Sequence, residues 1–443
     1  MPSNEGGLLN IPPLISNVLT ADAPLVVDSE GVWLIDSAGR RYLDGCSGAV
    51  VSAIGHAHPH VVATIRAQAA KVTFAHRGAF ASEAAIRLAD RLCSATDLAG
   101  AWFVNSGSEA MEAAIQFALQ YYREIGETDR CWFLSFGQGY HGNTLGGLSL
   151  SGHGRRAVVG RLAYDFPTLP TPYAYRDRGT LTESEYVERM LRDARSAVEA
   201  SATRLAGVVF EPVGGATLGV TVPPDGYLQG LEALCREFGI LLIADEVMTG
   251  LGRTGRTLAV EHWGLRPDIV AVGKSLGAGY TPIAATLLNS RVVSAIADGS
   301  GRVLGGHTYA GNPLSVAVAD AVLDVIEREG LVEKARVHGE DLGRRLGELK
   351  SDNPYLVDVR GLGMFWALEF RGDPAAPGDF AKAVAFAAME RGLMVYATTG
   401  GFNDAVVVAP PLTISPREMD TLVDLLHLAL RDAAEATLEL AES

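Results

Sequence analysis

Short apolar runs alternate with helix-like stretches through most of this chain of 443 residues, and this alternation limits the possible folds more than any other feature. The apolar runs have the length of buried strands, and the stretches between them have the spacing of amphipathic helices. The predicted strands are 101–104, 131–136, 205–210, 240–244, 268–272 and 282–288, and the predicted helices are 60–72, 82–94, 108–124, 183–200 and 227–238. Such alternation predicts an α/β fold with a mostly parallel central sheet and helices on both of its faces.

The pattern differs at both ends of the chain. Two strand-like runs before residue 45 predict a hairpin, and the chain after residue 313 predicts two helices, several strands and a long final helix. We therefore expect a large domain over residues 59–318 and a smaller α+β domain over residues 319–443. The N-terminal segment, residues 1–58, is expected to form part of the smaller domain.

Composition limits the class of partner and the compartment. The chain has 37 basic and 52 acidic residues, a net charge of −15, which argues against nucleic acid or an anionic membrane as a main partner. The four cysteines form no CxxC pair, which indicates free thiols in a reducing compartment. The start of the sequence does not have the pattern of a secretory signal, and no apolar run has the length of a membrane span. We expect a cytoplasmic protein.

Lys274 is the most informative single residue. The chain contains only five lysines, and the other four lie in helix-like segments with polar positions. Lys274 instead ends the apolar run 268–273, where a buried strand is predicted. A lysine in such surroundings loses its proton more easily, and the neutral amine can attack a carbonyl group. The position therefore suggests a lysine that forms a Schiff base.

Asp245 and Glu246 lie at the end of another predicted strand, which is where open α/β sheets bind their ligands. A buried carboxylate at that place needs a cationic partner, or it takes up a proton instead. An isolated Asp-Glu pair of this kind is more often a loop cap. The two acids and Lys274, 29 residues further on, are much stronger together than either feature alone.

Three further strand ends carry polar or aromatic residues. Ser106 and Glu109 have the spacing of a capping box, but the same helix start could bind a phosphate through its N–H groups and the hydroxyls of Ser106 and Ser108. The sequence leaves these two interpretations evenly balanced. Tyr140 could stack on a flat ring or could simply pack in a turn. Glu211 adds another acid, for which a solvated loop residue is the alternative.

Three apparent motifs are rejected. Residues 250–255 spell GxGxxG but precede no long helix, and residues 273–275 lack the earlier glycine of a P-loop. The histidines at 56, 58 and 60 have no cysteine and few acids nearby in sequence, so turn histidines near a pocket are favoured over metal ligands. We expect no metal site.

The remaining motifs together resemble the class III aminotransferases, the ω-aminotransferase and ornithine aminotransferase-like group of fold type I pyridoxal-phosphate enzymes. The resemblance covers most of the chain. The motifs occur in the family's order: Ser106-Gly107-Ser108, Tyr140-His141, Glu211, Asp245-Glu246-Val247, Lys274 and Gly306-His307-Thr308-Tyr309. The block 242–279 is the most specific part, because it matches the cofactor-attachment signature continuously.

The resemblance implies that pyridoxal 5'-phosphate is the cofactor. Lys274 would form the Schiff base with it and move the substrate proton, Asp245 would pair with the ring nitrogen, and Glu211 would lie near the ring hydroxyl and the substrate entrance. The resemblance also implies that Gly107 and Ser108 bind the phosphate, helped by Thr308 of the partner subunit, and Ser106 counts with them as a cofactor-binding residue. Tyr140 and Val247 are expected on the two ring faces, with His141 behind them. The resemblance thus implies a homodimer with shared active sites.

The expected substrate pocket departs from the better-known members. Many of them have an arginine that grips the substrate carboxylate, but Tyr396 takes its place here, and residues 392–416 contain no arginine. Val50 stands where many have an aromatic residue. Arg77 is a candidate for a substitute anchor, although a surface or interface arginine is the preferred interpretation.

We expect an aminotransferase that moves an amino group from an amine or ω-amino acid to a keto acid such as pyruvate or 2-oxoglutarate. A decarboxylating aminotransferase or an aminomutase shares the named residues and stays open as an alternative. A nicotinamide dehydrogenase would be suggested by the GxGxxG run alone. A non-catalytic protein that binds the cofactor is the remaining alternative.

Overall fold

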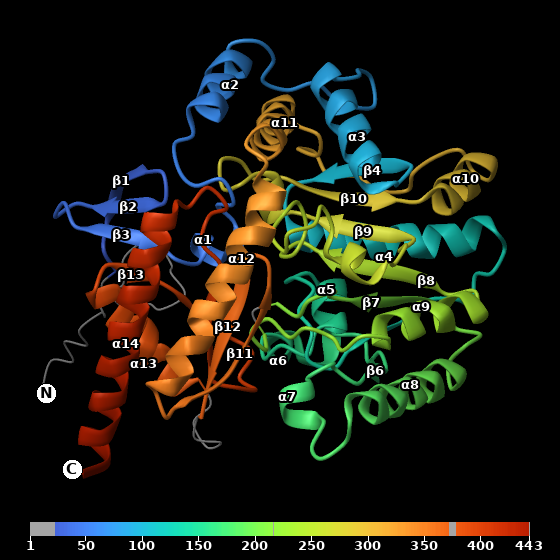
Figure 1. The fold of residues 1–443 in the computed structure, drawn as a ribbon. Helices are drawn as coiled ribbons and strands as arrows, with labels where there is room; N and C mark the ends of the chain where they lie inside the picture. Colours follow the sequence, from blue (N-terminus) through green and yellow to red (C-terminus); the bar gives the residue numbers. More distant parts are fainter. Residues whose placement is uncertain (1–22, 216, 372–377, 443) are drawn as a thin grey trace, which may run out of the picture.

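The computed structural model describes residues 23–215, 217–371 and 378–442, and a seven-stranded sheet forms its centre (Figure 1). In spatial order the strands are β4 (Gly100–Val104), β10 (Ala284–Leu288), β9 (Ile269–Val272), β8 (Leu241–Glu246), β7 (Leu205–Phe210), β5 (Trp132–Phe136) and β6 (Thr168–Leu169). Strands β9, β8, β7, β5 and β6 are parallel. The predicted mostly parallel sheet is confirmed.

Strand β10 is the exception, because it runs antiparallel to both of its neighbours, β4 and β9. Only residues 273–283 connect β9 to β10. A parallel pair needs a crossover of a dozen or more residues, usually with a helix. The short connection therefore reverses the chain direction.

Helices cover both faces of the sheet, as predicted. The helices α4 (Gly107–Glu124) and α10 (Ser290–Asp298) pack on one face, and their core includes Leu241 and Ile243 of β8. The opposite face carries Leu242 and Ala244 of β8. Its covering helices include α3 (Glu83–Thr96), α8 (Glu183–Glu199), α9 (Tyr227–Glu237) and α11 (Pro313–Arg328). Successive residues of a strand point to opposite faces, which explains how a run of apolar residues serves both.

Two smaller sheets lie beside the central one (Figure 1). The first contains β1 (Val26–Glu30), β2 (Trp33–Asp36), β3 (Arg41–Asp44) and β13 (Leu393–Met394), and the second contains β11 (Leu356–Leu362), β12 (Phe365–Phe370), β15 (Ala405–Val408) and β14 (Tyr396–Ala397). The helices of this part are α12 (Leu331–Glu348), α13 (Asp379–Glu390) and α14 (Pro416–Glu442).

The N-terminal hairpin joins the C-terminal part of the chain through a parallel pair, Leu43 with Leu393 and Asp44 with Met394. Residues 1–22 of the expected segment 1–58 lie outside the described residues. The expected boundary at 318/319 falls inside the continuous helix α11, so the division into domains stays a prediction.

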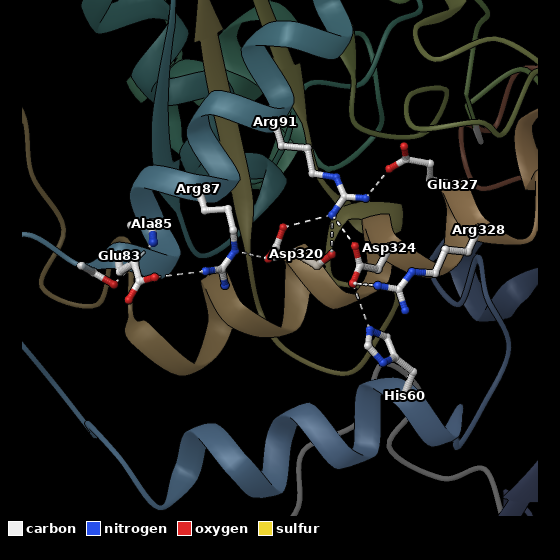
Figure 2. A network of polar contacts seen from close by, with 10 residues as sticks. His60, Glu83, Ala85, Arg87, Arg91, Asp320, Asp324, Glu327 and Arg328 are labelled. Atoms are coloured by element: carbon white, nitrogen blue, oxygen red, sulfur yellow. Dashed lines mark hydrogen bonds and ion pairs between the residues drawn. The ribbon is translucent and has the colours of Figure 1, made fainter.

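A network of charged side chains ties α3 to α11 (Figure 2). Arg91 of α3 reaches Asp320, Asp324 and Glu327 of α11 at 3.2, 2.7 and 2.6 Å. His60, on helix α2 (Pro59–Ala69), contacts Asp324 from the other side at 3.2 Å. Each of the histidines at 56, 58 and 60 has its own carboxylate, since His56 contacts Asp44 and His58 contacts Glu329, although His60 lies on α2 and not in a turn.

Several short elements complete the described chain. They are α1 (Ser47–Val50), α5 (Leu145–Leu150), α6 (Arg156–Val159), α7 (Ala174–Asp177) and single 3₁₀ turns at Gly160–Leu162, Ala259–Trp263, Lys274–Leu276 and Leu349–Ser351. In the part of the chain that the structure describes, no helix combines the length and the apolar character needed to cross a membrane.

Candidate active site

A cavity of about 180 Å³ opens where β7 and β8 end and α4 begins. Its lining residues are Gly107, Ser108, Met111, Tyr140, His141, Gly142, Glu211, Val213, Asp245, Val247, Met248, Thr249 and Lys274. The volume corresponds to about six water molecules. The cavity therefore has room for a small planar ligand and brings together the motifs that the sequence spreads over about 170 residues.

Asp245 and Glu246 point to different sides of strand β8, and only Asp245 lines the cavity. Glu246 accepts a hydrogen bond from the backbone N–H of Val260 at 2.9 Å and another from the hydroxyl of Thr249. Burial raises the pKa of Glu246 to about 7. Glu246 thus fixes the loop after β8, and Asp245 is available to a ligand.

His141 holds Asp245 in place. Its Nδ1 lies 2.8 Å from Oδ2 of Asp245, and the other carboxylate oxygen accepts the backbone N–H of Val247 at 3.1 Å. Burial alone would lower the pKa of His141, but the hydrogen bond and charge of Asp245, with a further contribution from Glu211, raise it. The pair therefore presents a negative carboxylate whose orientation is fixed from behind.

Lys274 begins the 3₁₀ turn Lys274–Leu276 directly after β9, with a φ of +40°. This left-handed conformation is unfavourable for a lysine and persists only where the surrounding structure enforces it. Burial lowers the pKa of Lys274 to about 8, although the charges of Asp245 and Glu211 act in the opposite direction. Near neutral pH a substantial fraction of the amine is therefore unprotonated and nucleophilic.

Glu211 is the second acid of the cavity and lies just after β7. Its carboxylate accepts the backbone N–H groups of Tyr140 at 3.2 Å and of Gly215 at 2.9 Å. Burial raises its pKa to about 7; His141 opposes this rise, and the charge of Asp245 adds to it. Glu211 is therefore a proton donor and acceptor near neutral pH, and it orients the loop that carries Tyr140.

The start of α4 shows features of both interpretations of its sequence, the helix cap and the anion site. Ser106 caps the helix by accepting the N–H of Glu109 at 3.2 Å, while the Glu109 carboxylate accepts from the backbone and side chain of Asn105. The capping box is therefore incomplete, because Glu109 does not return to the N–H of Ser106. Ser106 does not line the cavity, whereas Gly107 and Ser108 do. The first N–H groups of this 18-residue helix are available to an anion.

Two glycines allow the walls of the cavity to approach each other. A Cβ on Gly142, whose φ is +107°, would lie 2.8 Å from Cα of Ser108. A Cβ on Gly107 would lie 2.8 Å from Cγ1 of Val247. Val247 therefore packs directly under the helix start, and it also lies against Gly273, next to Lys274.

These residues fit a phosphorylated pyridine aldehyde. A lysine amine can attach an aldehyde, an oriented carboxylate can hold a protonated ring nitrogen, and a helix start can bind a phosphate. Within the described residues, the buried Nε2 of His141 and Oγ of Ser275, next to Lys274, have no hydrogen-bond partner. Polar atoms left in this state next to a cavity are consistent with a polar ligand there.

Besides Ser106, four expected residues do not line the cavity. Val50 is buried in the strained loop 47–50, with a φ of +61°. Tyr396 is half-buried in β14, and Arg77 stacks on the ring of Trp102 at 3.9 Å. Thr308 is exposed in a turn of this chain, so its expected role requires a second subunit.

Sequence reasoning missed part of the wall: Met111, Gly142, Val213, Met248 and Thr249. Met248 and Thr249 directly follow the predicted Asp245-Glu246-Val247 run, so their place just after the strand end could have predicted that they line the cavity. Val213 follows Glu211 in the same way. Met111 lies one helical turn after Gly107, and its position follows only once the helix start is known to face the cavity.

Comparison with known proteins agrees with this geometry. A family model described as "Aminotransferase class-III" matches residues 19–430. The chain is 39% identical to the uncharacterized aminotransferase YodT of Bacillus subtilis, over 93% of this chain and 96% of that protein. It is 34% identical to an adenosylmethionine-8-amino-7-oxononanoate aminotransferase of Nitratidesulfovibrio vulgaris, over 92% and 77%.

Solved structures give the same result. An amine transaminase from an uncultivated Pseudomonas species, in its PLP-bound form, superposes with a TM-score of 0.88 at 33% identity and covers 95% of this chain and 97% of that chain. An (S)-enantioselective ω-transaminase from Thermomicrobium roseum superposes with a TM-score of 0.87 at 35% identity, over 93% of each chain.

Proposed function

Because this chain belongs to the class III aminotransferase family and is a fold type I enzyme that uses pyridoxal 5'-phosphate to transfer amino groups, we propose a role for each residue of the cavity. The observation that carries the proposal is the buried Lys274, with a pKa near 8, in one cavity with the Asp245–His141 pair. When bound, the cofactor supplies an electron sink that stabilises negative charge on the substrate carbon.

Lys274 would hold the cofactor through its amine and would move a proton on the substrate carbon. Because burial keeps its pKa near neutral, the same amine can accept and donate a proton, which is the condition for an efficient general acid–base group. Asp245 would pair with the protonated ring nitrogen, and His141 keeps the Asp245 carboxylate oriented. Glu211 orients the Tyr140 backbone and controls polarity at the substrate entrance.

The helix start of α4 would hold the cofactor phosphate through Gly107 and Ser108. Tyr140 and Val247 would pack against the cofactor ring. Ser106 acts indirectly, since its hydroxyl already caps the helix. These roles fit the cavity wall, in which Gly107, Ser108, Tyr140 and Val247 all take part.

The substrates we propose are an amine or ω-amino acid as donor and a keto acid such as pyruvate or 2-oxoglutarate as acceptor. Purified enzyme would be mixed with single amines, diamines and amino acids while the visible absorbance of the bound cofactor is followed. A competent donor should abolish the band, and a keto acid should restore it. If no donor changes the band, the proposal of amine and ω-amino acid donors is wrong.

Borohydride reduction followed by peptide mapping tests the role of Lys274. The chain contains only four other lysines, Lys71, Lys334, Lys350 and Lys382, so the labelled peptide identifies the residue without ambiguity. The label should appear at Lys274 and should be absent from a Lys274→Ala variant. A label at another lysine would contradict the assignment.

We further propose a cytoplasmic homodimer in which Thr308 of the partner subunit completes the phosphate site. Thr308 directly precedes Tyr309, whose exposed ring meets the exposed ring of Phe74 edge to face, and the exposed Leu304 lies four residues earlier in the chain. Contiguous exposed apolar side chains of this kind are typical of a protein interface. All four cysteines are free, which supports a reducing compartment.

Subunit mixing tests the shared site. Lys274→Ala and Thr308→Ala subunits are each impaired, but a mixed dimer has one site with both native residues if Thr308 acts across the interface. Unfolding and refolding an equal mixture should restore about a quarter of native activity, because half of the dimers are mixed and half of their sites are intact. No gain over the separate variants would contradict the arrangement.

A further inference from the structure

The cavity needs a positive charge that its wall does not supply. Apart from Lys274, which the proposed function uses to hold the cofactor and to move a proton, the acidic and histidine side chains of the lining are Glu211, Asp245 and His141. A keto acid brings a carboxylate into this negative environment, and a carboxylate near two others is stable only beside a cation. The inference below rests on the proposed function, since it concerns the acceptor of that reaction.

Arg155 is the arginine that reaches the wall. Its Nη1 lies 3.3 Å from the hydroxyl of Tyr140, and its guanidinium lies 5.8 Å from the centre of the Tyr140 ring. Among the hydrogen bonds, ion pairs and cation–π contacts of the described residues, no other arginine side chain contacts a residue that lines the cavity.

Arg155 is also free to bind an anion. Its side chain is exposed, and no carboxylate lies within ion-pair distance of it among the described residues. The next residue, Arg156, is different, because it pairs with Asp165 at 3.4 Å. A guanidinium with no carboxylate partner can form a bidentate pair with an incoming carboxylate.

His153 fixes the backbone of Arg155 beside the cavity. Its Nδ1 accepts the backbone N–H of Arg155 at 3.1 Å, so the ring proton lies on Nε2, which donates to the hydroxyl of Thr399 at 3.1 Å. Burial, with a contribution from the charge of Arg155, lowers the pKa of His153 and keeps it neutral. The ring also packs 5.2 Å from Tyr140.

This connection places Arg155 beside the stretch that contains no arginine. Thr399 belongs to residues 392–416, and His153 joins that stretch to the turn that carries Arg155. Arg77, the candidate that the sequence suggested, is instead held on Trp102 and does not contact the cavity wall among the described residues. The positive charge therefore approaches from the loop after α5.

We propose that Arg155 is a specificity-determining residue that binds the carboxylate of the keto acid acceptor and of amino acid donors. Tyr140 and His153 are positioning residues in this arrangement. Tyr140 fixes the guanidinium at the edge of the cavity, and His153 fixes the backbone on which it stands. A donor without a carboxylate gains nothing from Arg155.

The test compares substrates with and without a carboxylate. Each half-reaction of the holoenzyme is measured in single turnovers with 1-phenylethylamine as the carboxylate-free donor, β-alanine as the carboxylate-bearing donor and pyruvate as acceptor. Arg155→Gln should lower kcat/KM for pyruvate and β-alanine by about 10- to 100-fold, the effect of losing a charge-assisted pair. The value for 1-phenylethylamine should change by less than about twofold.

Two further variants distinguish charge from position. Arg155→Lys should recover part of the loss, because it keeps the charge but not the bidentate geometry. Arg161→Gln is the matched control, since Arg161 is an exposed arginine of the neighbouring 3₁₀ turn that has no contact with Tyr140 among the described residues; it should behave like the native enzyme.

Binding without turnover gives a second readout. Calorimetric titration of pyruvate into the cofactor-loaded enzyme, with no amine present, should show a dissociation constant raised by a factor similar to the kinetic loss in Arg155→Gln. An equal loss for all three substrates, no loss for any, or an unchanged dissociation constant for pyruvate overturns the role of Arg155. If the native enzyme accepts no amine at all, the proposed function fails first, and that outcome is distinct.

Discussion

The pKa of Lys274 leads to a quantitative prediction about cofactor loading. Only the neutral amine attacks an aldehyde, so the rate at which apoenzyme attaches pyridoxal 5'-phosphate should follow the deprotonation of Lys274. With a pKa of about 8, about a quarter of the amine is neutral at pH 7.5, against about one part in a thousand for an ordinary lysine. The lowered pKa therefore raises the neutral fraction, and with it the expected rate of attachment, about 200-fold at that pH.

The assay is stopped-flow mixing of apoenzyme with the cofactor between pH 6 and 10, followed by absorbance. The rate should rise with pH to a midpoint near 8. Glu211→Gln should move the midpoint to lower pH, because the charge of Glu211 raises the pKa of Lys274 and the variant removes it. The ionisations of the cofactor itself are common to both proteins, so the difference between the two midpoints reports the protein alone.

A midpoint near 10 in the native protein would show that the amine is not desolvated as the structure indicates. A midpoint that stays in place in Glu211→Gln would show that Glu211 and Lys274 are not electrostatically coupled. Either result would refute the description of the cavity as a buried cluster of interacting charges. Arg161→Gln, which removes a charge elsewhere, should leave the midpoint unchanged.

Three stability predictions follow from the same structure. Lys274→Met should abolish turnover but raise the free energy of unfolding of the apoprotein by about 3 kcal/mol at pH 7, because the pKa of Lys274 is about 8 in the folded protein and 10.5 for an ordinary lysine. In the native apoprotein, the free energy of unfolding should correspondingly rise between pH 8 and 10.5. Denaturant titrations that show no such rise would contradict this. Arg253→Met should cost about 2 to 4 kcal/mol in the same assay, because the buried guanidinium donates to the carbonyls of Met364 and Pro410 and to the hydroxyl of Ser47. Arg91→Leu should cost about 1 to 3 kcal/mol by leaving the buried Asp320 with one partner fewer (Figure 2). Arg344→Leu removes an exposed pair on α12 and should leave the free energy of unfolding nearly unchanged. Similar losses for both variants would show that the network adds nothing.

The fold followed from the sequence where local pattern and tertiary packing agree. The strands and long helices of the central sheet have strong periodicity, so their positions were predictable to within a few residues. The antiparallel direction of β10 was not predictable, because it depends on the short connection after β9 and not on the residues of β10 itself. The short elements α5, α6, α7 and β6 have no repeat long enough to detect.

The GxGxxG run shows how a correct rejection can still miss a structural role. No long helix follows the run, which excludes a dinucleotide site, and the structure confirms the missing helix. Its arginine, Arg253, is nevertheless fully buried and connects three distant segments by hydrogen bonds. Glycines at 252 and 255 have positive φ values and lie close to α12, so the run serves packing. Nothing in the sequence indicates which distant carbonyls the arginine meets.

Within the cavity, the residues with a chemical role were easier to predict from the sequence than the residue proposed to recognise the substrate. Asp245, Glu211 and Lys274 were predictable because the ends of strands in one sheet must converge, and an ionisable side chain at such an end faces the place where ligands bind. The residue pattern by itself does not show which of Asp245 and Glu246 faces the cavity, since that depends on the face of β8 to which each points; the choice of Asp245 came from the family resemblance, and Asp245 is the one that lines the cavity. Arg155 lies in an irregular loop, next to an arginine that is merely paired at the surface. A substrate carboxylate can be bound by a cation on any loop around the rim of the cavity, so the position of that cation is fixed by tertiary contacts alone. For this reason the absence of an arginine from residues 392–416 predicts a different mode of carboxylate recognition, and the contact with Tyr140 is the observation from which we propose Arg155.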